Sequence, residues 1–248
     1  MRYFLFLILT FFSISAFSQN LGSIQIGGNT TTGTIQSYAF TSSLDFSKKL
    51  KNLMIGSNST YRWSEKSVSG SNQLALFENE FYTMDYISLE LKKQFKVLAF
   101  TEDQSSYTRK VKFLSSVGIG AGLSILTKGR FKLSFSEALM PEKYESELKS
   151  SYDNESIRSS SRLKIEYKLK KVDISSINLY QPSIYSEKNL KYSQNLNFRS
   201  TNSITMPLTK TYSIGFTYTD SYIGYSHYLN PKIKAEDKST SLVLKVCF

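Results

Sequence analysis

The stretch that decides the fold is Ser239-Thr240-Ser241-Leu242-Val243-Leu244-Lys245-Val246-Cys247-Phe248, at the carboxyl end of the sequence. Side chains on a β-strand point alternately to the two faces of its sheet. One face of this stretch is apolar and consists of Leu242, Leu244, Val246 and Phe248. The other face carries Ser241, Lys245 and Cys247. The pattern predicts a strand with one apolar and one largely polar face.

A soluble domain rarely ends inside such a strand, because chain termini fray unless something holds them. The stretch resembles the closing strand of bacterial outer-membrane β-barrels, in which a terminal aromatic residue belongs to the signal read by the barrel assembly machinery. The resemblance implies that this signal consists of Phe248, Val246, Leu244 and Leu242. We therefore expect the outer membrane as the location, its lipids as partners, and the assembly machinery as a partner during biogenesis.

The amino-terminal residues have the three parts of a signal peptide. Arg2 gives a positive start, residues 3–12 form an apolar run broken only by Thr10, and Ala16-Phe17-Ser18 is a small-x-small cleavage site. About ten apolar residues are too few to cross roughly 30 Å of hydrocarbon as a helix. We predict cleavage between Ser18 and Gln19, with a signal peptide over 1–18 and a barrel domain over 19–248.

The same alternation recurs through the rest of the chain. It is longest in segments 113–125 and 211–222, and both exceed the five or six residues of an average strand. Further alternating segments are 38–46, 53–63, 131–135, 163–169 and 192–206, and a less regular one, 81–91, predicts a strand with a bulge.

The connections between these segments alternate in length. Short polar turns are expected at 48–51, 92–96, 127–130, 170–173 and 207–210, and longer polar stretches at 27–33, 64–72, 102–110, 141–156, 182–189 and 223–238. Outer-membrane barrels alternate short periplasmic turns with longer extracellular loops. The sequence therefore predicts an all-β, antiparallel, up-and-down transmembrane barrel of about twelve strands with both termini in the periplasm. An extracellular β-sandwich also alternates along its strands, but the strand length and the terminal Phe favour the barrel.

Composition excludes several other classes. Apolar residues make up 40% of the chain and aromatic residues 14%, yet no run of about 20 apolar residues follows the signal peptide, as a helical membrane protein would require. A single Cys allows no intramolecular disulfide, and a single His allows no His-based metal cluster. We expect no metal, no cofactor and no nucleic-acid partner.

Three motifs carry a family resemblance. They are Gly28-Asn29 in a polar first turn, Gly118-x-Gly120-x-Gly122 in a strand, and Tyr180-Gln181-Pro182-Ser183 at the end of a strand. In this order and spacing the chain resembles the YdiY-like salt-induced outer-membrane proteins, a family whose domain has no assigned function. The resemblance implies an outer-membrane barrel, and it assigns no reaction, substrate or catalytic residue.

Enzyme chemistry has little support in the sequence. Hydrolases of the outer membrane use a Ser and His pair with a polar orienting group. His227 is the one candidate base, and its context Ser226-His227-Tyr228 lacks the His-x-Ser pattern of the barrel deacylases. We predict no catalytic residues. The alternating glycines of 118–122 lack the strand-to-helix context of a nucleotide-binding loop and are expected to clear space inside the barrel.

The inward face of the predicted barrel has a basic excess. The expected inward residues are Arg62, Lys112, Lys132, Arg162, Lys164, Arg199 and Lys245, against Asp45, Glu90 and Glu166. Rings of Lys and Arg make anion pores, whereas a barrel much smaller than a porin can be filled by its own side chains. An interior network of ion pairs and hydrogen bonds is the favoured interpretation, and a narrow passive channel with anion preference is the alternative.

Charge also differs between the two predicted ends. The short turns carry Lys48, Lys49, Lys51, Lys92, Lys93, Lys96, Lys128, Arg130, Lys170, Lys171 and Lys210 against Asp173 alone, and the whole chain has a net charge of +11. A long connection instead holds Glu142, Glu145, Glu147, Asp153 and Glu155, which are expected to be solvated rather than to bind a divalent cation. We predict a non-catalytic outer-membrane barrel, with a role in envelope stress implied by the family name; a lipid-modifying enzyme is the less favoured reading.

Overall fold

The computed structural model describes residues 20–31, 37–67, 74–148, 153–188, 195–209, 211–225 and 236–247. Twelve antiparallel strands form a closed barrel in which each strand pairs with its neighbours in the chain. β1 and β12 close the ring, from Ser23 opposite Cys247 to Gly27 opposite Val243. The strands are β1 (Asn20–Thr31), β2 (Ser37–Leu50), β3 (Leu53–Ser67), β4 (Leu74–Lys92), β5 (Phe95–Ser106), β6 (Val111–Lys128), β7 (Phe131–Ser146), β8 (Asn154–Lys168), β9 (Asp173–Ser186), β10 (Leu196–Pro207), β11 (Tyr212–Ile223) and β12 (Glu236–Cys247). The predicted all-β, twelve-stranded, up-and-down barrel is confirmed.

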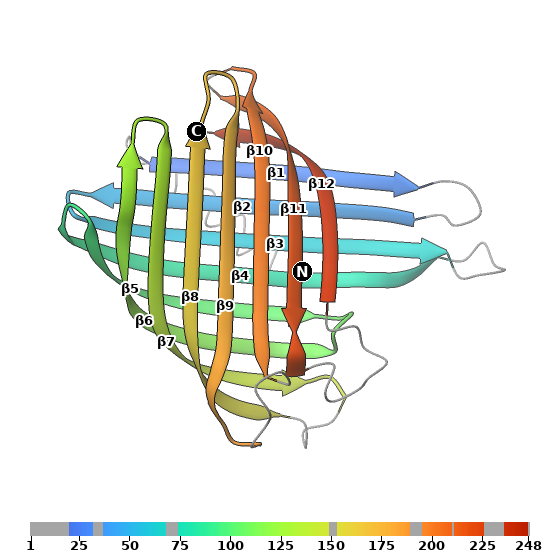
Figure 1. The fold of residues 1–248 in the computed structure, drawn as a ribbon. Coiled ribbons are helices and arrows are strands. Elements are labelled where there is room, and N and C mark those ends of the chain that lie inside the picture. Colours follow the sequence, from blue (N-terminus) through green and yellow to red (C-terminus); the bar gives the residue numbers. More distant parts are fainter. Residues whose placement is uncertain are drawn as a thin grey trace.

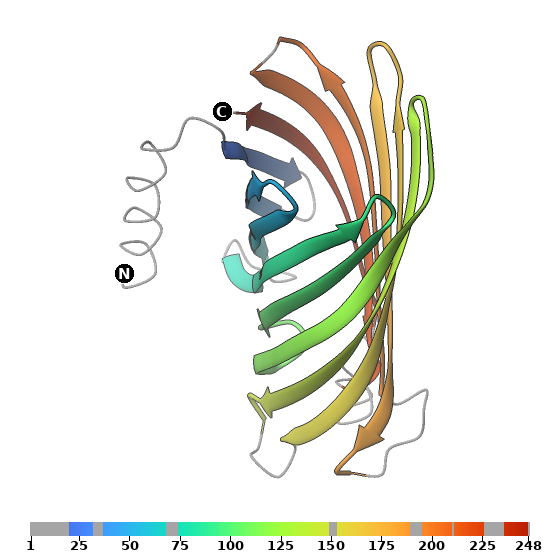
Figure 2. The same ribbon diagram turned by 90° about the vertical axis from the view of Figure 1, so that its left-hand side faces the viewer.

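The strands are strongly tilted, as closure of a sheet into a barrel requires. Figure 1 shows β1 to β4 running across the view behind β8 to β12, which run down it, and Figure 2 shows the same walls from the side. Among the described residues, no helix is long and apolar enough to cross a bilayer.

The two ends of the barrel differ. At one end, which we call the turn end, the strands are joined by residues 51–52, 93–94, 129–130, 169–172 and 208–211, and β1 begins and β12 ends there. Lys51 and Gly129 adopt positive φ angles of 52° and 56° in two of these turns. The opposite, loop end carries the other connections. The predicted assignment of the turn end to the periplasm stays a prediction.

Several strands extend further toward the loop end than the alternation of apolar residues indicates. β5 continues to Ser106, so its connection to β6 is a turn of residues 107–110 instead of the predicted 102–110. β7 continues to Ser146 and β8 begins at Asn154, so the predicted loop 141–156 is mostly strand. In these extensions both faces of the strand carry polar side chains, so the alternation of apolar residues is absent. The backbone hydrogen bonds between the strands continue nevertheless.

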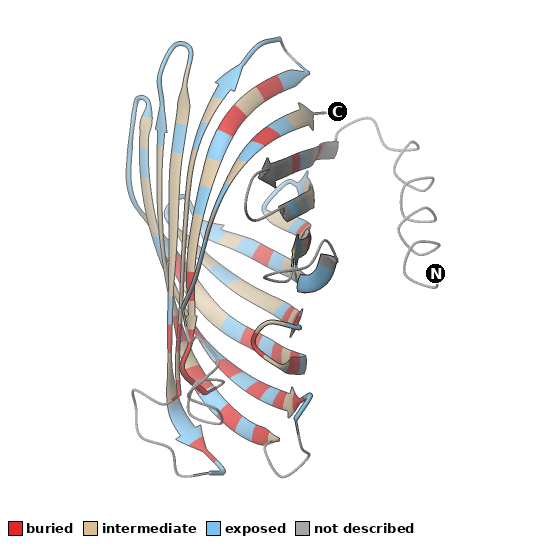
Figure 3. Ribbon diagram, turned by 90° about the vertical axis from the view of Figure 1, so that its right-hand side faces the viewer, coloured by how far each residue is buried: buried red, intermediate tan, exposed pale blue. Residues whose placement is uncertain are grey.

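The outer face of the barrel is apolar over its turn-end half. Exposed fractions of 60% for Phe216, 48% for Leu244 and 53% for Ile125 show that large apolar side chains point away from the lumen. Most buried positions gather instead toward the loop end of the interior (Figure 3) and include many polar side chains. The molecule therefore has an apolar outer belt and a polar inside, the reverse of a soluble core.

Glycine gives bulky inward side chains their room. A Cβ on Gly118 would lie 2.2 Å from the ring of Phe100, and one on Gly56 would lie 2.4 Å from the ring of Tyr86. The glycines of β6 were expected to clear space inside the barrel. At Gly118, that space is filled by the aromatic ring of Phe100 on the neighbouring strand β5.

Candidate functional site: the polar lumen

Arg199 of β10 reaches across the lumen. Its Nη2 donates a hydrogen bond of 3.1 Å to Oε1 of Gln104, and its Nη1 lies 3.9 Å from Oε1 of Glu102, both on β5. Its guanidinium carbon also lies 4.1 Å from the ring centroid of Tyr82 on β4, a cation–π distance. β10 is not a neighbour of β4 or β5 in the sheet, so these contacts tie opposite walls together.

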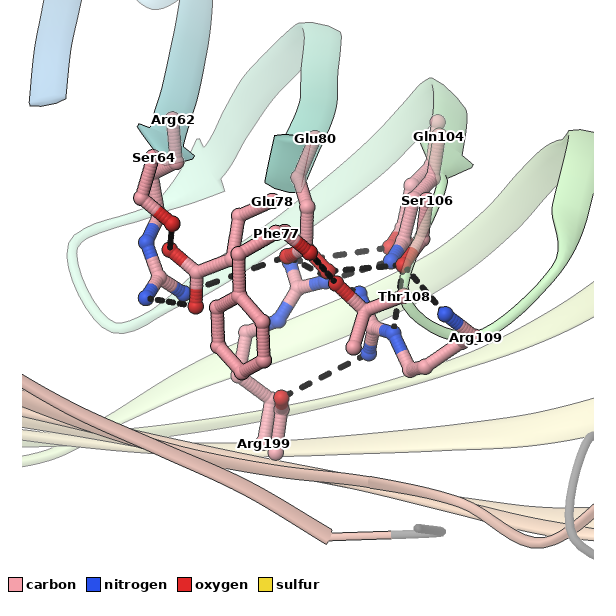
Figure 4. Close-up of polar contacts among 12 residues, drawn as sticks. Arg62, Ser64, Phe77, Glu78, Glu80, Gln104, Ser106, Thr108, Arg109 and Arg199 are labelled. Carbon is pink, nitrogen blue, oxygen red and sulfur yellow. Dashed lines mark hydrogen bonds and ion pairs between the residues drawn. The ribbon is translucent and has the colours of Figure 1, made fainter. Parts of the chain in front are cut away.

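A second group of charges lies near the loop end of β3, β4 and β5 (Figure 4). Glu80 accepts hydrogen bonds from the hydroxyl of Ser106 at 2.7 Å and from Nη2 of Arg109 at 3.4 Å, and it forms an ion pair with Nη1 of Arg62 at 3.9 Å. Nη1 of Arg109 also donates to the hydroxyl of Ser221 on β11 at 3.5 Å. Arg109, which follows β5 in the turn, thus forms a second link across the lumen.

Arg158 of β8 is the centre of the third group and is 1% exposed. Its Nε and Nη2 both lie 2.7 Å from Oε1 of Glu142 on β7. Its Nη1 donates to the backbone oxygens of Gln181 and Asn195, and its Nη2 also donates to Oδ1 of Asn195. Arg158 thus donates four hydrogen bonds, of the five that a guanidinium can make, and Nη2 adds an ion pair with Glu142.

These groups close the loop-end half of the lumen. The cavity between Glu102, Arg109, Glu142 and Arg199 measures about 20 Å³. A space of that size holds about one water molecule. Side chains of β5, β7 and β10 therefore leave little free space around these four residues.

The turn-end half is wider. A cavity of about 320 Å³ opens along the inner face of β8 to β12. Its charged residues are Lys168, Lys245, Glu166 and Asp173, and its hydroxyl residues are Ser175, Ser203, Thr205, Thr209, Thr211 and Ser213. Charged groups of both signs and hydroxyl groups line this cavity, which we call the vestibule.

Three basic side chains share the interior of the barrel. Arg162 and Lys164 of β8 lie within electrostatic range of Lys96 of β5, and Glu90 lies opposite Lys96 in the register of β4 and β5. Nζ of Lys164 lies 3.0 Å from Oε1 of Glu166. Within the part of the chain that the structure describes, Nε of Arg162 is buried without a hydrogen-bond partner, which leaves a donor available inside the barrel.

The structure brings several of the sequence-predicted inward residues into these groups. Arg62, Arg199, Lys164 and Glu166 take part in the ion pairs described above, Arg162 lies beside Lys96, and Lys245 lines the vestibule. Leu242 and Leu244 of the predicted assembly signal are each 48% exposed on the outer face, and Val246 is half-buried. Ser18, Gln19, His227 and Phe248 lie outside the described residues.

Lys112 is the exception among the predicted lumen residues. The register of β6 against β7 shifts between Val111 and Phe113, so Lys112 occupies a β-bulge. Its side chain is 68% exposed, and its Nζ lies 3.6 Å from Oε2 of Glu145. A bulge adds a residue that follows neither face of the strand, which is why strict alternation misplaces it.

Sequence reasoning missed the residues that close the lumen, namely Glu102, Gln104, Arg109, Glu142 and Arg158. Four of them fall in stretches interpreted as loops, and Arg158 lies between the predicted loop 141–156 and the predicted strand 163–169. The available signal was spacing: Glu102, Gln104 and Ser106 continue the inward positions of Leu98 and Phe100 by steps of two. The proposed acidic loop is also divided, since Glu142 points inward and Glu145 pairs with Lys112 and Lys143 outside. Among the described residues, no group of three His, Cys, Asp or Glu side chains could hold a metal ion.

Comparison with known proteins identifies the fold. The NanC porin superposes with a TM-score of 0.52 at 8% sequence identity, covering 90% of this chain and 98% of NanC. The KdgM porin, solved in complex with disordered oligogalacturonate, gives 0.46 at 9% identity over 92% and 98%, and LpxR from Salmonella typhimurium gives 0.46 at 6% over 92% and 99%. No protein-family model and no curated protein matches the sequence.

The shared fold and the apolar outer belt decide the location. This chain is a β-barrel of the bacterial outer membrane. At such low identity the likeness to NanC concerns the fold alone, so what the barrel does must be argued from its own lumen.

Proposed function

We propose that this outer-membrane barrel is closed at rest and serves as a membrane-embedded envelope protein without catalytic activity, not as an open pore. The observation that carries the proposal is Arg199, whose contacts with Gln104, Glu102 and Tyr82 tie opposite walls together. The cavity of about 20 Å³ beside it has room for about one water molecule. Membership of the YdiY-like family, and the stress role its name implies, are part of this proposal and rest on the three motifs.

Single-channel recording in a planar bilayer tests the closed state. The wild-type protein should show no steady conductance, or steps far below those of a general porin. Replacing Arg199 and Arg109 together by Ala removes the two arginine links across the lumen and should produce frequent openings. The matched control is Lys143→Ala, which removes an exposed ion pair with Glu145 on the outside of the barrel and should leave the recording unchanged. A steady wild-type conductance of porin size would contradict the proposal.

A narrow channel with anion preference is the second candidate. It is favoured by the positive charges of Lys96, Arg162 and Lys164, which lie within electrostatic range of one another inside the barrel, because basic side chains around a pore favour anions. Under a KCl gradient, the reversal potential of any wild-type openings would then report chloride selectivity. Arg162→Gln should reduce that selectivity, whereas openings without ion preference would exclude this candidate.

We also propose that the basic residues at the turn end anchor the barrel against anionic lipid. Each Lys near an anionic membrane surface contributes about 1 kcal/mol. Replacing Lys48, Lys49, Lys92 and Lys93 by Gln should therefore weaken association with anionic-lipid vesicles at least about tenfold at low salt. Binding to neutral vesicles should not change.

The control for this anchoring is a pair of exposed lysines at the loop end, Lys112 and Lys143, whose side chains are 68% and 58% exposed. Their replacement by Gln should affect vesicle association much less. Equal effects of the two sets, or no effect of either, would remove the anchoring role.

A further inference from the structure

Four polar side chains face outward on two neighbouring strands. They are Ser176 and Asn178 of β9, and Ser200 and Asn202 of β10. Arg199 points into the lumen, and side chains alternate along a strand, so the next residue, Ser200, points out of the barrel. Asn178 lies opposite Ser200, and Ser176 lies opposite Asn202 in the register of the two strands. We call this group the Asn/Ser ladder.

The ladder is a continuous chain of hydrogen bonds. Nδ2 of Asn202 donates to the hydroxyl of Ser200 at 3.0 Å, and that hydroxyl donates to Oδ1 of Asn178 at 2.8 Å. Nδ2 of Asn178 then donates to the hydroxyl of Ser176 at 3.1 Å. The four side chains are therefore ordered toward one another on the outer surface.

The ladder lies within the apolar belt. Below it are Ile174 and Ile204, exposed by 39% and 53%, and above it are Tyr180, exposed by 41%, and Phe198. Ser176 is the third residue after Asp173, and Ser200 is the seventh before Pro207. At about 3.3 Å per residue and a tilt near 40°, the ladder lies about 8–18 Å from the turn end, inside an apolar band about 25 Å tall.

Hydrogen-bonding capacity is left over in this apolar setting. An Asn side chain has two N–H donors and a carbonyl that accepts two bonds. Within the described residues, each Asn amide of the ladder donates once, which leaves one N–H on Asn178, one on Asn202, and the carbonyl oxygen of Asn202. Lipid tails cannot satisfy these groups, and unsatisfied polar groups in hydrocarbon are costly.

The polar surface continues toward β7. Glu137, outward on that strand, accepts hydrogen bonds from the hydroxyls of Ser159 and Ser161 of β8. Ser161 lies opposite Tyr180, the residue just above the ladder on β9. Polar groups thus cross four neighbouring strands of the wall, and the charged one, Glu137, lies on β7, three strands away from β10 and outside the ladder.

We propose that a second copy of this chain packs its β9–β10 face against the same face of the first, in a two-fold symmetric dimer within the membrane. A two-fold interface brings the same patch of both subunits together, so the patch must be complementary to itself. The Asn/Ser ladder is uncharged and has both spare donors and a spare acceptor, so it meets this condition. The opposite wall does not, since its outward residues include Asp85 and Asp103, which would repel their counterparts.

Sedimentation in detergent micelles and in lipid nanodiscs tests the dimer. The wild-type protein should be dimeric, and Asn178→Leu with Asn202→Leu should weaken dimerisation at least tenfold. The matched control is Ser59→Val with Thr83→Val, which removes an outward hydroxyl pair 2.9 Å apart on the opposite wall and should leave the dimer intact. A monomeric wild type in both media, which would leave the ladder to lipid or to another protein, overturns the proposal.

Cysteine cross-linking keeps the test independent of how well the double variant folds. With Cys247 replaced by Ser, at least one of Ser176→Cys, Ser200→Cys and Asn202→Cys should form a cross-linked dimer with a short bifunctional reagent. Thr83→Cys should not. Equal cross-linking at Thr83, or none at the three ladder positions, contradicts the proposed face whether or not the lumen conducts.

Discussion

Replacing Arg158 by Met is expected to lower the free energy of unfolding by about 3–5 kcal/mol, the usual cost of breaking a buried ion pair. Arg158 and Glu142 are 1% and 2% exposed at their side chains. Without the guanidinium, the carboxylate of Glu142 keeps only the 3.3 Å hydrogen bond from Ser156 among its described donors. A nearly bare negative charge would then remain inside the barrel.

Urea unfolding in lipid vesicles measures this loss. A second variant, Glu142→Leu with Arg158→Met, should recover most of the stability, because replacing both charges by apolar groups of similar volume is often neutral. Lys49→Met provides the exposed comparison. Its pair with Glu90 is 3.6 Å long with side chains 64% and 42% exposed, so its loss should cost less than about 1 kcal/mol. Equal costs for the single and double variants would show that the two charges are not coupled.

The barrel could be predicted because every second residue of a membrane-spanning strand faces lipid hydrocarbon and is therefore apolar. Tyr212, Ile214 and Phe216 alternate with Ser213 and Gly215, and the structure pairs them with β12 in one unbroken register. Where the strands extend beyond the hydrocarbon, their outward residues need not be apolar and the alternation ends. Gln104 and Asn154 are strand residues, yet nothing in the hydropathy of their neighbours marks them as such.

The closure of the lumen was beyond sequence reasoning for a related reason. An ion pair such as Arg199 with Glu102 joins residues of β10 and β5, and alternation states only that both point inward. Which strands face each other across the lumen depends on the tilt and stagger of the whole barrel. The Asn/Ser ladder was missed because the outward apolar residues around it, such as Phe198 and Ile204, satisfy the pattern while Ser200 and Asn202 between them break it.

Replacing Phe216 by Arg should cost about 2–4 kcal/mol of folding free energy, the penalty for a cation on the lipid face near the bilayer midplane. Phe216 is 60% exposed on the outer face. It lies opposite Ile204 on β10 and Leu242 on β12, which are 53% and 48% exposed. An arginine there has only apolar neighbours in register. A folding yield in micelles reduced about thirtyfold or more would match this cost, since about 1.4 kcal/mol corresponds to a factor of ten.

The matched control is the next residue, Thr217→Arg, because a one-residue step moves a side chain to the other face of the strand. Thr217 lies opposite Ser203 on β10 and Ser241 on β12, and Ser203 lines the vestibule of about 320 Å³. A glycine control at Gly215 would be unsuitable, since its Cβ would lie 2.4 Å from the backbone oxygen of Ile204. Thr217→Arg should fold at close to the wild-type yield, because its charge can remain hydrated in the vestibule. Equal yields for Phe216→Arg and Thr217→Arg would mean that the outer face of β11 does not meet lipid, and the assignment of the two faces would have to be reversed.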